Sequence, residues 1–77
     1  MNEKKFIERR PDVMMGKPVI KGTRITVEHV MRKLAGGYSV DDLLENYPHL
    51  EKVQITAALE YAADMIANEE IIESVDL

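Results

Sequence analysis

The stretch GKPVIKGTRITVEHV, from Gly16 to Val30, contains the turn and helix signals on which the fold prediction rests. Pro18 has no backbone N–H to donate, so a strand begins there or lies at a sheet edge. β-Branched residues lie on both sides of Gly22, which adopts positive φ at little steric cost. The pattern predicts a β-hairpin that turns at Gly22. It is not a phosphate-binding loop, because the Gly-Lys-Ser/Thr dyad of such loops is absent.

Helical signals follow the hairpin region, which is assigned to residues 6–27. Thr26 is a suitable N-cap, and Ser39 is another, with an acidic residue three positions later. Apolar residues then recur at helical spacing, and Pro48 ends the middle segment. The predicted helices span residues 27–35, 40–47 and 51–67. The predicted fold class is therefore mainly α with a small β-hairpin or sheet, a three-helix arrangement of helix-turn-helix type.

The chain has 77 residues, which indicates a single domain, residues 1–67, followed by an acidic tail, residues 68–77. It has no cysteine and two histidines, so no disulfide, metal site or cofactor is predicted, and no catalytic arrangement suggests an enzyme. A domain this small gains stability from a partner subunit, and a hairpin edge invites pairing, so a homodimer is predicted. No signal peptide or membrane span is recognised, which favours a cytoplasmic protein.

Charge divides the chain into two halves. Up to Lys33 there are nine basic and four acidic residues, a net charge of +5. From Leu34 onward one basic residue faces ten acidic ones, a net charge of −9. Such polarity indicates two charged faces with different partners, although a solvated surface with head-to-tail attraction in a dimer is the alternative.

The basic half suggests a nucleic-acid surface, because lysine and arginine neutralise phosphates. In a helix-turn-helix the later helix lies in the major groove, and its start adds further polar residues. The predicted DNA contacts are Lys17, Lys21, Arg32, Lys33, Lys52, Gln54 and Thr56. An ordinary solvated surface remains the alternative. Glu51, Glu60 and Asp64 on the third helix would repel phosphates.

Two further predictions concern single features. Arg24 is expected to join the hairpin to the second helix by a structural ion pair with Asp42 or Glu45. The acidic tail contains apolar residues that can anchor a protein partner or complete a dimer core. These predicted partner contacts are Ile71, Ile72, Val75 and Leu77.

Two segments, GKPVIKGTRITV and LAGGYSVDDLLENYPHLEKVQITAALEYA, resemble the domain-of-unknown-function family numbered 433. The likeness runs from about Ile7 to Ala63, and its Gly-Thr-Arg and Tyr-Pro-x-Leu elements are specific at this spacing. The resemblance implies a homeodomain-like or winged-helix-like three-helix core behind a small sheet. It also implies similarity to antitoxins of type II toxin–antitoxin pairs, which block a PIN-like ribonuclease and repress their own operon as dimers.

The leading hypothesis is therefore an antitoxin that binds a PIN-like ribonuclease toxin and contacts operator DNA. A stand-alone helix-turn-helix DNA-binding transcriptional regulator and a structural dimerisation module are the alternatives.

Overall fold

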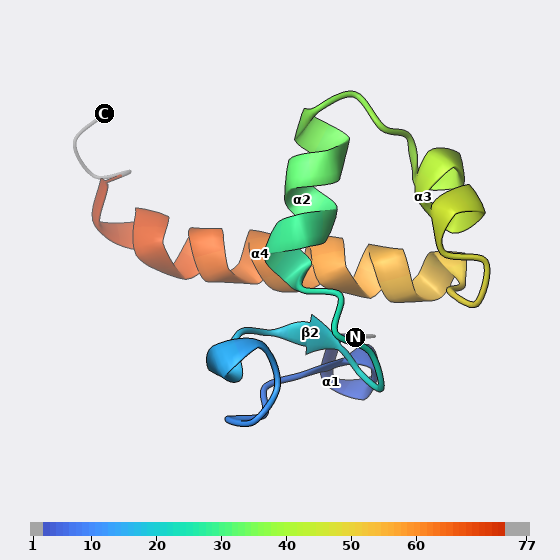
Figure 1. The fold of residues 1–77 in the computed structure, drawn as a ribbon. Coiled ribbons are helices and arrows are strands. Elements are labelled where there is room, and N and C mark those ends of the chain that lie inside the picture. The colour runs from blue at the N-terminus through green and yellow to red at the C-terminus, as the bar shows by residue number, and fades with distance from the viewer. Residues whose placement is uncertain (1–2, 74–77) are drawn as a thin grey trace.

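The computed structural model describes residues 3–73, and the side chains of residues 4–68. In chain order the elements are α1 (Glu3–Phe6), β1 (Ile7–Glu8), the 3-10 turn η1 (Met14–Gly16), β2 (Val19–Ile20), α2 (Val27–Ala35), α3 (Val40–Asn46) and α4 (Lys52–Glu73). The described part is mainly helical with one small antiparallel sheet, which confirms the predicted class. In Figure 1, α4 crosses the molecule with α2 and α3 above it and α1 with the strands below.

The sheet joins two segments that lie before and after η1. Ile7 pairs with Ile20, and Glu8 pairs with Val19, in antiparallel register. Ile7, Val19 and Ile20 are buried, so this short sheet supports the core although each strand has two residues.

The hairpin predicted around Gly22 is present in short form. The segment after Gly22 pairs antiparallel with β2 through one bridge, Val19 to Thr26, and the N–H of Ile20 donates to the carbonyl of Ile25 at 2.9 Å. What the sequence did not predict is that β1, before η1, is the other strand of the sheet. Gly22 does take a positive φ of 82°, and Thr23 Oγ1 accepts the backbone N–H of Ile25 at 3.0 Å. Thr26 then caps α2 at once, so too few extended residues remain to form a strand.

The helix starts follow the local signals in the sequence. Thr26 Oγ1 accepts a backbone N–H of the first turn of α2 at 2.9 Å. Ser39 and Asp42 form a reciprocal capping box at α3, with bonds of 3.0 and 2.9 Å. At α4 the side chain of Gln54 accepts the N–H of Glu51 at 2.7 Å, so one half of a capping box is present there.

The core forms one cluster around the first half of α4. Its buried members are Ile7, Ile20, Val27, Val30, Leu43, Leu50, Ile55, Ala57 and Ala58. Ala57 and Ala58 are fully buried, and their small side chains allow neighbouring elements to approach α4 closely. Tyr47, which follows α3, bonds to α2 through its hydroxyl, which lies 2.9 Å from Nε2 of His29.

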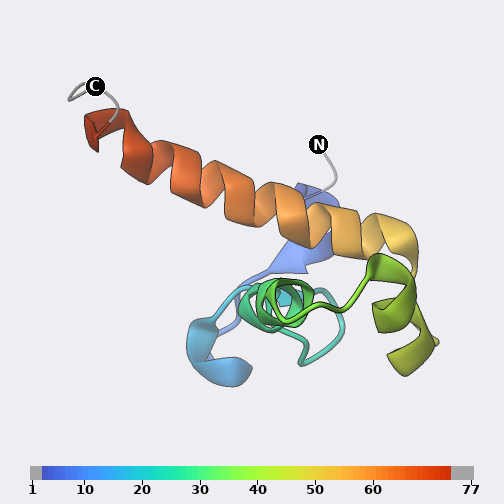
Figure 2. The ribbon, with the colours of Figure 1, turned by 90° about the horizontal axis from the view of Figure 1, so that it is seen from above.

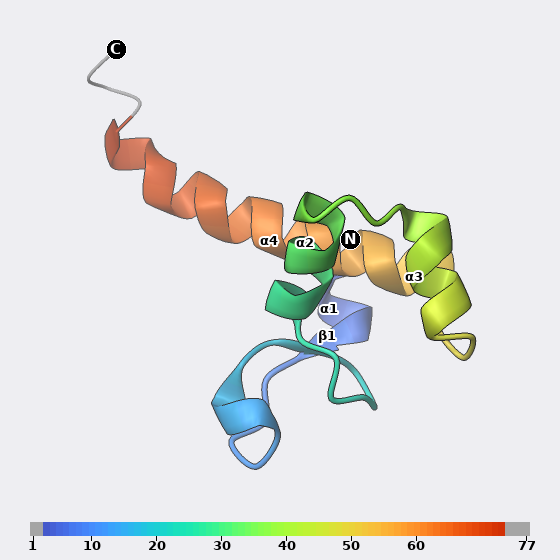
Figure 3. The ribbon, with the colours of Figure 1, turned by 45° about the horizontal axis from the view of Figure 1, so that its top comes forward.

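The last helix is longer than the sequence predicted. It was expected to end at residue 67, but α4 continues to Glu73. The segment contains neither glycine nor proline after Lys52, so no residue type interrupts the helix there. Figures 1, 2 and 3 show its C-terminal end projecting beyond the other elements. We call residues 63–73 the arm. Among residues 3–73, no helix is both long and apolar enough to cross a membrane.

Candidate functional site

Two of the predicted DNA contacts meet at one carboxylate. Nζ of Lys17 lies 3.1 Å from Oε1 of Glu28, and Nε of Arg32 lies 3.0 Å from Oε2 of the same residue. The hydrogen bonds from Lys17 and then Arg32 lower the pKa of Glu28 below its ordinary value. We call these three exposed residues the Glu28 cluster. It carries a net charge of +1, and a loop and α2 together position it.

Lys33 and Lys21 lie on different elements. Lys33 follows Arg32 on α2, and its Nζ lies 4.7 Å from the centroid of the Tyr38 ring, a cation–π distance. Lys21 is exposed in the turn after β2, and its backbone N–H donates to the carbonyl of Phe6 at 2.7 Å. Lys33 is therefore the sequence neighbour of Arg32 in the Glu28 cluster. Lys21 lies next to the small sheet, to which its backbone is hydrogen-bonded.

The other three predicted DNA contacts lie elsewhere. Lys52, Gln54 and Thr56 occupy the start of α4, beneath α3, and η1 lies toward the opposite side in Figures 1 and 2. The Gln54 side chain caps its own helix, so reading a base would require it to give up that bond. Lys52 and Thr56 are exposed. The sequence-predicted set thus divides between two regions of the surface.

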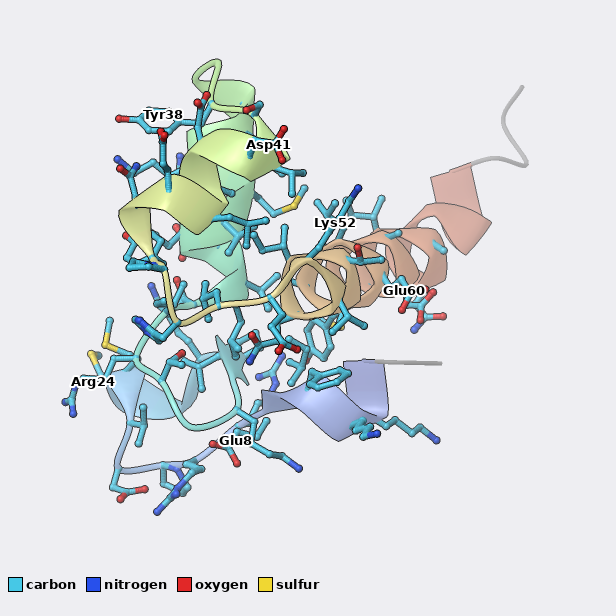
Figure 4. All side chains as sticks on the ribbon, turned by 90° about the vertical axis from the view of Figure 1, so that its right-hand side faces the viewer. Glu8, Arg24, Tyr38, Asp41, Lys52 and Glu60 are labelled. Atoms are coloured by element: carbon cyan, nitrogen blue, oxygen red, sulfur yellow. The ribbon has the colours of Figure 1, made fainter. Side chains whose placement is uncertain are left out.

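The ion pair predicted for Arg24 is not formed. Among residues 4–68, the salt bridges join Arg10 to Asp12 and connect the Glu28 cluster, and none involves Arg24. Figure 4 places Arg24 at the far side of the molecule from Asp41, the neighbour of the expected partner in α3. The turn after β2 places Arg24 near η1, where it lines a hollow with Lys17 and Met15.

The predicted partner contacts lie at the end of α4 and beyond. Ile71 and Ile72 belong to the last turn of α4, of which the structure describes the backbone. Val75 and Leu77 lie outside the described residues. The residues of the arm closer to the core are described in full, and all of them from Ala63 to Asn68 are exposed.

A groove between α2 and α4 is a feature that the sequence did not predict. It has a volume of about 380 Å³. We call it the α2–α4 groove; its apolar lining includes Pro18, Met31, Tyr61, Met65 and Ile66, and its charged lining is Arg9 and Glu28. Two of its large apolar residues, Met65 and Ile66, are 42 % and 49 % exposed.

Arg9 closes one part of this groove by contacting α4. Its Nε donates to the hydroxyl of Tyr61 at 2.9 Å, and its guanidinium lies 5.9 Å from the centroid of that ring. The two residues are 52 positions apart, so no local pattern could have indicated this contact. By contrast, Glu28 and Arg32 are four positions apart on a predicted helix, a spacing that does indicate an ion pair.

Comparison with known proteins identifies relatives of this chain. The family described as "Protein of unknown function (DUF433)" matches residues 7–62. An uncharacterized protein of Sinorhizobium fredii, y4eO, is 37 % identical over 59 residues. That alignment covers 77 % of this chain, and the chain spans 27 % of the length of the relative.

A solved structure has a similar fold. The crystal structure of a DUF433 member protein from Anabaena variabilis is 30 % identical and superposes with a TM-score of 0.74. The superposition covers 92 % of this chain and 68 % of that one. The likeness therefore includes nearly all the elements described above.

Proposed function

The chain belongs to the DUF433 family, and from that premise we propose that it is an antitoxin of a type II toxin–antitoxin pair. In this role it is a dimeric binding protein of the cytoplasm that neutralises a PIN-like ribonuclease. The role requires no catalytic group on this chain, only a surface that complements the nuclease.

The arm of α4 is the observation that supports this proposal. It contains four acidic residues and no basic one, together with apolar residues at regular intervals. It projects from the body (Figures 1 and 3) and contributes no buried side chain between Ala63 and Asn68. A nuclease that cleaves RNA binds a phosphate backbone through cationic residues. An acidic helix with apolar anchors is complementary to such a groove in charge and in shape.

The core of the protein packs against the first half of α4 and not against the arm. Its buried residues, Ile55, Ala57 and Ala58, precede the arm. Residues of the arm can therefore contact a partner without being withdrawn from the core. Asp64 is exposed and lies on the arm, which makes it a suitable position for a test.

The proposal is tested by capture and inhibition. The tagged chain, expressed in its native host, is expected to retain a small ribonuclease encoded beside it. Adding the chain to that nuclease should abolish RNA cleavage at an equimolar ratio. Asp64→Lys should weaken inhibition by about tenfold or more, because it reverses a charge at the contact. Glu45→Lys makes the same charge change on the exposed surface of α3 and serves as the control.

Two results of this experiment would contradict the proposal. If no nuclease is retained, or if Asp64→Lys and Glu45→Lys inhibit equally well, the arm is not the inhibitory surface. Truncation after Asn68 provides a second measurement, because it removes Ile71 and Ile72 with the rest of the tail. Full inhibition by the truncated chain would also contradict the proposal.

Operator binding is a second candidate function, and the Glu28 cluster is the observation that favours it. Lys17 and Arg32 come from different elements and meet at Glu28, so two cations can face one phosphate backbone. Glu28 offsets part of this charge. Glu28→Gln should therefore strengthen binding to a promoter fragment, whereas Lys17→Ala should weaken it and reduce the salt slope by about one.

The same titration discriminates among the alternatives. Lys52→Ala tests the start of α4, and the variant that reduces the salt slope identifies the surface used. DNA binding without any retained nuclease would favour a stand-alone transcriptional regulator. If neither DNA nor nuclease is bound, a structural dimerisation module is the remaining hypothesis.

A further inference from the structure

The apolar surface of the arm continues into a concave part of the molecule. Met65 and Ile66 are large, apolar and nearly half exposed, and they line the α2–α4 groove with Met31 and Tyr61. A helix with one buried face has a polar opposite face. Met65 and Ile66 continue the apolar stripe of Ile55 and Ala58 along α4, but they lie beyond the elements that cover the first half of the helix and are therefore exposed. An exposed apolar patch next to a groove is typical of an interaction surface.

Charge indicates which partner fits this surface. The edge of the groove carries Arg9, and the Glu28 cluster adds Lys17 and Arg32 with one carboxylate between them. The arm has the opposite composition, with acidic residues and no basic residue. The arm of a second copy therefore matches both the apolar lining and the basic edge of the groove, and the match holds in both directions across a two-fold axis.

The sheet edge, on which the sequence predicted dimerisation, is a poorer candidate. β2 is paired with β1 along one side, and on the other side Val19 bridges to Thr26. The outer side of β1 offers two residues, too few for a stable intermolecular ladder. Among residues 3–73, the arm and the groove thus present the larger unpaired surface.

We propose that the α2–α4 groove is the contact between two copies of this chain, whose arms pack antiparallel across a two-fold axis near Met65 and Ile66. In this arrangement, the residues of one arm face the residues of the other arm in reverse order. This register places Tyr61 opposite residue 70 of the second copy. Arg9, which contacts Tyr61, is then next to position 70 of that copy, where the sequence has a glutamate. Two such pairs flank an apolar centre.

The contact is independent of the proposed function, because it needs neither nuclease nor DNA. Sedimentation equilibrium of the 77-residue chain alone therefore separates failure of this inference from failure of the antitoxin proposal. The wild-type chain is expected to be a dimer at micromolar concentration. Ile66→Arg should raise the dimer dissociation constant by about 100-fold or more, since it introduces a charge into the apolar centre of both copies. Ala67→Arg adds the same side chain at the next exposed position and should change the constant by less than about tenfold.

A charge exchange tests the register. Arg9→Glu and Glu70→Arg should each weaken the dimer by about tenfold, and the double variant should recover most of that loss, because the two positions lie opposite each other. Circular dichroism of every variant checks that the helices remain. A wild-type chain that sediments as a monomer, an Ile66→Arg variant that stays dimeric, or a double variant that recovers nothing would each overturn the proposal.

Discussion

Replacement of Leu43 by alanine tests how α3 is held in place. Leu43 is the one buried residue of the seven in α3, and it is 2 % exposed. Removing a buried leucine side chain loses its transfer free energy and leaves a cavity, which together cost about 2–5 kcal/mol. A domain of this length has a free energy of unfolding of roughly 4–12 kcal/mol. We expect Leu43→Ala to lower it by about 3 kcal/mol.

The assay is urea unfolding followed by circular dichroism, at one protein concentration because dimerisation would contribute to stability. With an m-value of about 1 kcal/mol/M, the midpoint should fall by about 3 M. Leu44→Ala is the matched control, since Leu44 is the next residue, of the same type, and only half-buried. Its effect should be about half as large or smaller.

The outcome can contradict this account in two ways. If Leu43→Ala shifts the midpoint no more than Leu44→Ala, the side chain of Leu43 is not the anchor of α3. If helical signal from α3 is lost in a separate, earlier transition, α3 unfolds locally, and the loss of free energy cannot be assigned to the whole domain.

Three other perturbations test single contacts. Tyr47→Phe removes the hydroxyl that lies 2.9 Å from His29 and should cost about 1 kcal/mol in urea unfolding. Gly22→Ala should lower the free energy of unfolding by about 1–2 kcal/mol because φ is 82° there, with Gly22→Asn milder; thermal melts would show the order. The lowered pKa of Glu28 means that its contribution to stability is present above its ordinary value of 4.5 and is lost as pH falls through the lowered pKa. An NMR titration of the Glu28 carboxyl should therefore have its midpoint below that value, and Lys17→Met should raise it; a midpoint that Lys17→Met leaves unchanged would contradict the contact.

Local signals explain why the helices could be predicted from the sequence. The capping residues Thr26 and Ser39 act on backbone groups three residues away, so their pattern is visible in any short window. The family resemblance extended the prediction to the order of the helices. The end of α4 was missed for a related reason. No breaker residue follows residue 67, so no local signal in the sequence marks where the helix ends.

Contacts between distant residues account for what was not predicted. The strand partner of Ile20 is Ile7, thirteen residues earlier, and the choice depends on α4 covering both side chains. The prediction for Arg24 failed because the turn at Gly22 places this residue beside η1, away from α3. The groove edge depends on Arg9 reaching Tyr61, and no periodicity relates those two positions.

The division of α4 relates this fold to its proposed function. Ile55, Ala57 and Ala58 fix the first half of the helix in the core, and that half is constrained by every element packed on it. The second half has no buried side chain between Ala63 and Asn68, so substitutions there change the surface while leaving the core intact. Because α4 is continuous, the arm is helical before any partner binds. A segment that is already helical loses less conformational entropy on binding than a tail that must first fold.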